Sequence, residues 1–201
     1  MSEMTCAANA SGCTPMQRGL PSPEVDLETV SEIFAVKGDG GFTEFPGAVD
    51  FVQGSTMAGG VFVTVRVDDE RIHEDSQYLE LGKEKYLTFL RTYHLWSLEA
   101  PISITRAHLY KQATLVPLDR PGADSMTETK RDLHIGEHLD DIGGFTFHGI
   151  IERTDIKCEL DALPVGLTPN AKINRSIKTG EITTWDDVLL DEDQIVVKLR
   201  R

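Results

Sequence analysis

The residues best suited to chemistry lie together near the middle of the chain. Arg91, Tyr93, His94 and Ser97 fall close to one another, directly before a segment predicted to be a helix. An imidazole can transfer a proton near neutral pH, and the neighbouring polar side chains can hydrogen-bond a polar substrate. We therefore predict His94 as a candidate catalytic residue and the other three as candidate substrate-binding residues. The alternative is a half-buried His94 that satisfies backbone groups at the turn.

Two more candidate substrate-binding residues lie near the N-terminus. Arg18 is in a proline-rich loop, and its planar guanidinium could bind a carboxylate or phosphate through two donors. A solvated loop arginine is the alternative. Asn9 could present its amide to an active site, or it could assist the C-terminal cap of the first helix.

Two other patterns do not predict a metal or a cofactor site. His134 and His138 have the spacing that would pair them on a helix, but Gly136 between them favours a strand and a turn. The glycine-rich segment 38–41 follows no convincing strand and opens no helix, as a dinucleotide-binding turn must. It is predicted to be a flexible surface turn, so we assign no cofactor-binding or metal-binding residue to this chain.

The elements that must position the central candidates are predicted on both sides of them. Residues 61–67 alternate valine with other residues, which is typical of a strand, and residues 86–90 are predicted to form a second one. A helix is expected to start at 97–101, with Pro101 in its first turn, and to run to about Tyr110. The candidates at 91–97 would therefore lie between a strand and a helix.

The remaining N-terminal part is predicted to be rich in loops. Residues 3–10 favour a helix that ends at Gly12, residues 24–35 a short element, and residues 68–75 a polar turn. No capping residue precedes the first helix, so we expect a further segment of protein upstream.

The C-terminal part contains a repeat. Residues 130–139 and 174–183 share an arginine, an aliphatic residue and a Gly-Glu pair in step, which predicts two similar β units packed against one another. Arg131 and Arg175 would form ion pairs with Glu137 and Glu181 or line a sugar-acid groove. Strands are predicted at 143–149 and 195–199, a short helix capped by Thr184 at 184–187, and core positions at Phe145, Phe147 and Trp185.

Composition excludes several classes of protein. The 201 residues carry 33 acidic and 20 basic side chains, a formal net charge of −13 that disfavours a nucleic-acid partner. No apolar run is long enough to span a membrane, and no secretory signal opens the chain. The three cysteines show no metal-binding or disulfide spacing. We expect a soluble cytoplasmic protein with reduced thiols.

Two resemblances to known families follow from these motifs. The repeat together with residues 163–167 and 184–188 resembles a SAF domain, a small β-clip module, over residues 127–201. The segments 9–12, 18–19, 46–51 and above all 93–104 resemble the C-terminal half of a bacterial oxidoreductase family that includes deoxyxylulose-phosphate-reductoisomerase-like enzymes. That family is similar to homoserine dehydrogenases, which combine a Rossmann domain, a catalytic α+β domain and a terminal SAF domain.

The resemblance implies an α+β chain without a Rossmann domain of its own. Residues 1–112 would be the C-terminal part of the catalytic domain, 113–126 a linker, and 127–201 the SAF domain. The implied function is reduction or oxidation of a small polar hydroxy or oxo compound, phosphorylated or not. NAD(P)H would be held by a Rossmann domain on a separate polypeptide or on an absent N-terminal segment. The chain alone would be inactive, and an oligomer is expected. The alternative is a non-enzymatic SAF protein for carbohydrate binding or oligomerisation.

Overall fold

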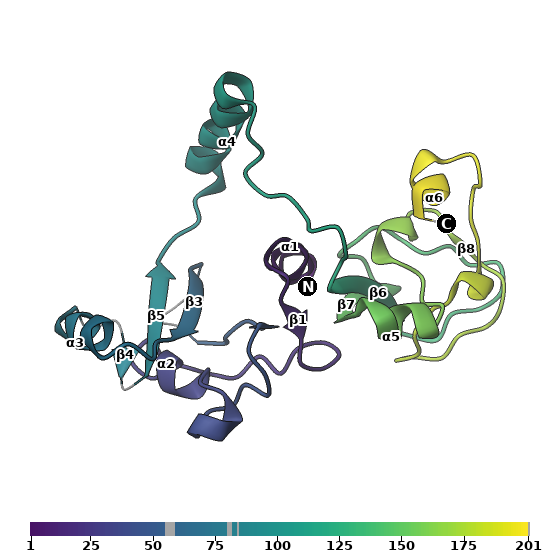
Figure 1. The fold of residues 1–201 in the computed structure, drawn as a ribbon. Coiled ribbons are helices and arrows are strands. Elements are labelled where there is room, and N and C mark those ends of the chain that lie inside the picture. The colour runs from purple at the N-terminus through teal and green to yellow at the C-terminus, as the bar shows by residue number, and fades with distance from the viewer. Residues whose placement is uncertain (55–58, 80–81, 84, 201) are drawn as a thin grey trace. The chain divides into compact units, whose positions relative to one another are not determined.

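The computed structural model describes residues 1–54, 59–79, 82–83 and 85–200 and shows a mixture of helices and strands (Figure 1). The chain divides into two compact units, one made of Met1–Leu20 and Pro117–Arg201 and the other of Pro21–Val116. One unit boundary lies inside the segment 113–126. The first 20 residues belong to the same compact unit as the C-terminal part. The predicted assignment of 1–112 to a catalytic domain, 113–126 to a linker and 127–201 to a SAF domain stays a prediction.

The unit Pro21–Val116 is built around a three-stranded antiparallel sheet. Its elements are α2 (Val30–Ile33), a 3-10 helix (Lys37–Asp39), β2 (Ala48–Val49), β3 (Val61–Arg66), α3 (Glu70–Tyr78), β4 (Gly82–Lys83), β5 (Tyr86–Arg91) and α4 (Trp96–Tyr110). The strand order is β3-β5-β4, and Val61 pairs with Arg91 at one end of the register. The two predicted strands and the predicted helix up to Tyr110 are confirmed.

One face of this sheet has a small apolar core. Phe62 of β3 and its register partner Leu90 of β5 pack with Phe34 against the buried Val25 and Val30. The rings of Phe34 and Phe62 meet edge to face with centroids 5.0 Å apart, a favoured geometry for aromatic pairs. This packing explains why the alternating segment 61–66 forms a strand.

The other face of the sheet and the helix that follows it are open. Val61 and Val63 of β3 and Phe89 of β5 are exposed, and α4 has no buried residue along its 15 positions. In Figure 1, α4 projects beyond the end of β5 instead of lying on the sheet. Trp96, at the start of α4, is 79% exposed.

A helix replaces the polar turn predicted at 68–75. The carboxylate of Asp69 accepts hydrogen bonds from the backbone N–H groups of Arg71 (2.9 Å) and Ile72 (3.2 Å), and α3 begins directly after it. An aspartate N-cap satisfies donors that the first turn of a helix leaves free. The prediction was wrong because the high polarity of this segment hid its capping residue.

The unit that contains both chain ends has its own core. Its elements are α1 (Ser2–Ser11), β1 (Thr14–Pro15), β6 (Ala123–Thr129), β7 (Phe147–Arg153), α5 (Thr154–Glu159), a 3-10 helix (Val165–Leu167), β8 (Lys172–Ile173), a 3-10 helix (Trp185–Asp187), β9 (Val188–Leu189) and α6 (Ile195–Arg200). The pairs β6-β7 and β8-β9 are antiparallel. Helix α1 ends at Gly12 with a φ of 79°, as predicted.

The two copies of the repeat meet as nearly symmetric halves. Leu133 and Ile177, at equivalent positions of the two copies, each donate a backbone N–H to the carbonyl of the other, at 2.9 and 3.0 Å. Gly136 and Gly180 are also equivalent, and both adopt a positive φ in a turn. The predicted packing of two similar β units is confirmed.

The predictions near the repeat have different outcomes. Phe147 is fully buried, Trp185 packs partly buried against the same core, and Thr184 caps the short helix at 185–187, all as predicted. Phe145, by contrast, is 85% exposed, so its predicted core position was wrong. The predicted strand 143–149 begins only at Phe147, because Asp140 binds the backbone N–H groups of Phe145 and Thr146 and closes a loop there.

The chain ends in a helix and not in the predicted strand. Residues Ile195–Arg200 form α6, although Ile195 and two valines favour β structure. Strand propensity depends on a neighbouring strand to pair with, whereas a helix satisfies its backbone groups internally. Val197 is buried in the core and Arg200 forms an ion pair with Asp124 of β6, which fixes the helix in place. No helix within the described ranges is long and apolar enough to cross a membrane.

Candidate functional site

His94 lies in the connection between β5 and α4 and is held by one backbone carbonyl. The Gly59 carbonyl oxygen is 2.6 Å from His94 Nδ1 and also accepts the His94 backbone N–H at 3.1 Å. Gly59 precedes β3, the neighbour of β5 in the sheet, so this contact prolongs the pairing of the two strands. The imidazole therefore satisfies a backbone group, as the alternative interpretation expected, but its ring is exposed and not half-buried.

Arg91 and Glu99 form a second link across the same connection. Arg91 Nη2 at the end of β5 is 2.5 Å from Glu99 Oε1 in the first turn of α4. A carboxylate near a helix N-terminus is also favoured by the helix dipole. The predicted substrate-binding guanidinium is thus committed in part to an intramolecular ion pair, which leaves it oriented but exposed.

Tyr93 and Ser97 complete this group of polar residues. Both are exposed, Tyr93 one position before His94 and Ser97 in the first turn of α4. Pro101 was predicted to lie in the first turn of this helix. The helix begins at Trp96, so Pro101 lies beyond the first turn and this prediction was wrong. Since proline has no N–H, the Ser97 carbonyl lacks the donor that a helix normally supplies four positions later.

We call Arg91, Tyr93, His94 and Ser97 with the Gly59 carbonyl the β5–α4 corner. It can hold a polar ligand through hydroxyl and guanidinium groups and exchange a proton with it through the imidazole. All four side chains face solvent, where water weakens electrostatic interactions. Efficient chemistry at this corner therefore requires that something cover it.

The two N-terminal candidates lie in the other compact unit. Arg18 Nε is 3.0 Å from Glu152 Oε2, and the Glu152 side chain is nearly buried. Asn9 donates to the Ala123 carbonyl and accepts the Ala123 N–H, both at 3.0 Å, and so joins α1 to the start of β6. Gly12 caps α1 without the Asn9 side chain. A substrate-binding role of either residue stays a prediction, and both now have a structural partner.

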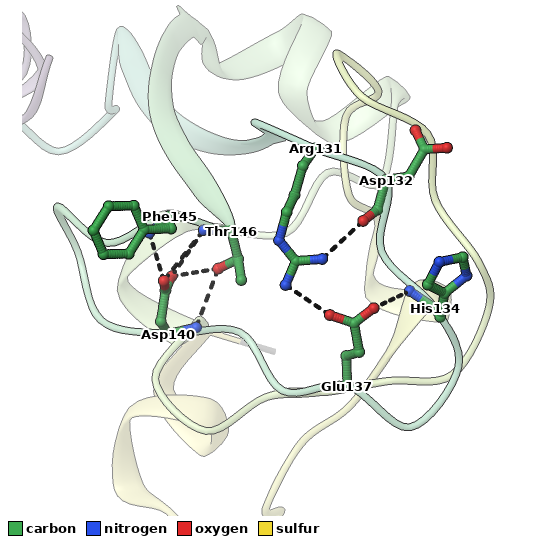
Figure 2. A network of polar contacts seen from close by, with 7 residues as sticks. All are labelled: Arg131, Asp132, His134, Glu137, Asp140, Phe145 and Thr146. Atoms are coloured by element: carbon green, nitrogen blue, oxygen red, sulfur yellow. Dashed lines mark hydrogen bonds and ion pairs between the residues drawn. The ribbon is translucent and has the colours of Figure 1, made fainter.

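The two arginines of the repeat each bind a carboxylate within the C-terminal unit, and Figure 2 shows Arg131 with Glu137. Arg131 Nη2 is 2.7 Å from Glu137 Oε2, as predicted, and this hydrogen bond lowers the pKa of Glu137. For Arg175 the predicted partner was Glu181. Its partner in the structure is Asp187 instead, at 2.6 Å. Glu181 instead accepts the backbone N–H of Lys178, just as Glu137 accepts that of His134. The symmetry of the repeat predicted equivalent glutamate partners for the two arginines. It could not predict Asp187, because this buried residue lies outside the repeat.

The carboxylates beside this network are stabilised in their ionised form. Burial alone would raise the pKa of Asp187, but hydrogen bonds from Arg175 and Thr184 outweigh burial and lower it. The hydrogen bond from Lys178 and those from Thr179 lower the pKa of Asp132 to about 2. These groups are saturated by local partners, so they act as structural charges and not as proton donors near neutral pH.

The described residues do not fit a bound dinucleotide. Lys37–Asp39 form a 3-10 helix, and a side chain at Gly41 would strike the Ala35 carbonyl, so the glycine segment is a compact turn. The sheets β3-β5-β4, β6-β7 and β8-β9 are antiparallel, whereas a nucleotide-binding fold needs parallel strands with crossover helices. In the same parts of the chain, no group of three His, Cys, Asp or Glu side chains could hold a metal ion.

Two groups that bind side chains of the corner, the Glu99 carboxylate and the Gly59 carbonyl, were not predicted from the sequence. Glu99 had a signal, because it is an acidic residue in the first turn of a predicted helix, close behind Arg91. The Gly59 carbonyl had none, since it is a main-chain group far from His94 along the chain. Only the strand pairing brings the two together.

Comparison with known proteins identifies the part of the chain that contains this corner. No curated protein matches the chain. Residues 1–100 match the family model described as the catalytic domain of the oxidoreductase DRL. The match includes β3, β5, the corner and the first residues of α4. Residues 1–100 are therefore part of a DRL oxidoreductase catalytic domain.

Proposed function

We propose that residues 1–112 are the substrate side of an NAD(P)-dependent oxidoreductase. The observation that carries this proposal is the match of residues 1–100 to an oxidoreductase catalytic domain, which contains the β5–α4 corner. The substrate is a small polar hydroxy or oxo compound, with or without a phosphate group. Arg91, Tyr93, His94 and Ser97 support this class, because they offer a cation, hydroxyls and an imidazole on one surface.

The cofactor is proposed to reside on a separate Rossmann-domain polypeptide. An oxidoreductase needs a redox cofactor, and the described residues do not fit a dinucleotide. The exposed apolar side chains of α4 support a protein partner at this helix, because such patches commonly mark interaction surfaces. Covering α4 would also cover the adjoining corner and exclude water from it. The chain alone is then inactive, and the working enzyme is an assembly.

The test is a calorimetric titration of NADH and NADPH into the purified chain. The titration is run with the chain alone and with the product of the neighbouring reading frame. We expect binding heat in the mixture only. Binding by the chain alone would contradict the assignment of the cofactor to a partner, and no binding in either sample would favour the second candidate function below.

The C-terminal residues 127–201 are proposed to form a SAF domain. The support is the repeat at 130–139 and 174–183, whose copies exchange equivalent backbone hydrogen bonds. The location in the cytoplasm and the lack of a nucleic-acid or membrane partner stay predictions that rest on the composition.

A second candidate function, a non-enzymatic carbohydrate-binding or oligomerisation module, is favoured by the loop at 140–146. Its apolar side chains Ile142 and Phe145 are exposed, while Asp140 fixes the loop through Phe145 and Thr146 (Figure 2). A rigid aromatic residue loses little conformational entropy when it binds, which suits recognition. Titration of a panel of sugar acids against the wild type and Phe145→Ala distinguishes this candidate, because only a binding module would lose sugar affinity in the variant.

A further inference from the structure

The contact between His94 and Gly59 fixes which ring nitrogen of the histidine carries a proton. A carbonyl oxygen has no proton to give, so His94 Nδ1, 2.6 Å from the Gly59 oxygen, must be the donor. A neutral imidazole carries one proton only. Its other nitrogen, Nε2, therefore holds an unshared electron pair and is the one able to accept a proton.

The direction of the ring is also fixed. The His94 backbone N–H binds the same Gly59 oxygen, so the main chain and the side chain are held at one point. The ion pair between Arg91 and Glu99 ties the end of β5 to the first turn of α4 across the same connection. These two links restrain the corner from both sides. Because the side chain itself is exposed, a ligand can reach it.

We infer that His94 acts through Nε2 as the proton acceptor for a ligand hydroxyl, and that the Gly59 carbonyl is the group that positions it. The choice of a hydroxyl compound rests on the proposed function, whereas the assignment of the nitrogen rests on the geometry alone. In the step, the hydroxyl O–H bond breaks and its proton moves to Nε2, which leaves an alkoxide and an imidazolium. The hydrogen bond from Nδ1 to Gly59 then becomes charge-assisted and stronger.

The first test is nitrogen NMR of the histidine side chains in the full chain. Protonated and unprotonated imidazole nitrogens resonate far apart, and the His94 signals are assigned by their loss in His94→Asn. We expect Nδ1 to be protonated and Nε2 unprotonated in the neutral imidazole. A neutral imidazole with a protonated Nε2 and an unprotonated Nδ1 would overturn the inference.

Two variants separate the proton acceptor from the structural contact. The amide nitrogen of Asn takes the place of Nδ1, whereas that of Gln takes the place of Nε2. His94→Asn is expected to keep the bond to Gly59 and hence the thermal midpoint of the wild type, and His94→Gln to lower the midpoint. The opposite order would show that the bond to Gly59 is not what holds the corner.

The functional readout uses the assembled oxidoreductase. His94→Asn should lose about 100-fold to 10,000-fold in turnover, the range for loss of a general base, while cofactor titration is unchanged. Turnover equal to the wild type would overturn the role of Nε2. If the assembly never binds NAD(P)H, the proposed function fails, yet the NMR result still decides which nitrogen of His94 accepts the proton.

Discussion

The β5–α4 corner and the repeat of the C-terminal unit treat their polar groups in opposite ways. In the repeat, arginines and carboxylates bind one another or nearby backbone groups, and Leu133 and Ile177 lie buried between the copies. In the corner, four polar side chains and the apolar residues of α4 face solvent. A folded protein rarely leaves a large apolar surface exposed without a use. The contrast teaches that the repeat satisfies its polar groups internally, whereas the corner and α4 leave theirs available for the proposed partner.

The largest expected effect comes from a matched pair of phenylalanines in the C-terminal unit. Phe147→Ala should lower the free energy of unfolding by about 3–5 kcal/mol, because it empties a fully buried site. Phe145→Ala, two positions earlier but exposed, should change it by less than about 0.5 kcal/mol. Urea denaturation measures both. Equal losses would show that the loop at 140–146 packs against the core in solution.

The same substitution should have opposite results at two aspartates, one in each unit. Asp187→Asn removes a buried charge that binds Arg175 and Thr184, and should cost about 2 kcal/mol of unfolding free energy, discounted because Arg175 is exposed. Burial raises the pKa of Asp50, so its ionised form is disfavoured in the folded state. Asp50→Asn should therefore be neutral or stabilising at pH 7. Loss of stability in both variants would contradict this difference.

A smaller effect is expected from α4, and only in the assembly. Replacing Leu98 and Ile102 by Gln should leave the unfolding free energy of the isolated chain within about 0.5 kcal/mol, because neither side chain is buried. The same variant should weaken binding of the proposed Rossmann-domain partner by roughly 10-fold or more. Sedimentation velocity of the chain alone is the control. Dispersal of a pre-existing oligomer by the variant would instead identify a second copy as the occupant.

The smallest effect concerns a single surface charge. The pKa of Asp132 is lowered to about 2 by Lys178 first and by Thr179 second. A lowered carboxyl pKa stabilises the folded state above the unfolded pKa of 3.8, and this stabilisation is lost as the pH falls from there toward 2. Lys178→Met should raise the pKa of Asp132 and reduce this acid-dependent loss. Carbon NMR of the Asp132 carboxyl group, titrated in both proteins, measures the shift.

Local patterns predicted most of the elements around the corner. Alternating valines predicted β3, a helix-favouring segment predicted α4, and Gly12 predicted the end of α1, because each signal depends on near neighbours. Predictions failed where a distant group decides. The C-terminal residues form α6 and not a strand, and Val197 of this helix is buried in the core.

The candidate site was predicted in its residue types but not in its geometry. His94 and its neighbours stood out because they cluster before a helix start. The carbonyl that orients His94 and the Ala123 groups that bind Asn9 are set by strand pairing or by distant packing. No local sequence pattern encodes them. The exposure of Phe145 could not be predicted locally either, because it depends on the loop that Asp140 closes by binding the Phe145 backbone N–H.

The discontinuous C-terminal unit has a consequence for synthesis on the ribosome. Its first segment, Met1–Leu20, emerges before Pro21–Val116, but β6, which Asn9 binds through Ala123, is made only afterwards. Domains generally fold as units while the chain is made. The inserted unit is therefore free to fold first, and α1 must remain without its strand until β6 has left the ribosome. A chain that terminates after Val116 but before Ala123 would leave α1 without β6, so such incomplete chains present a protease-sensitive end.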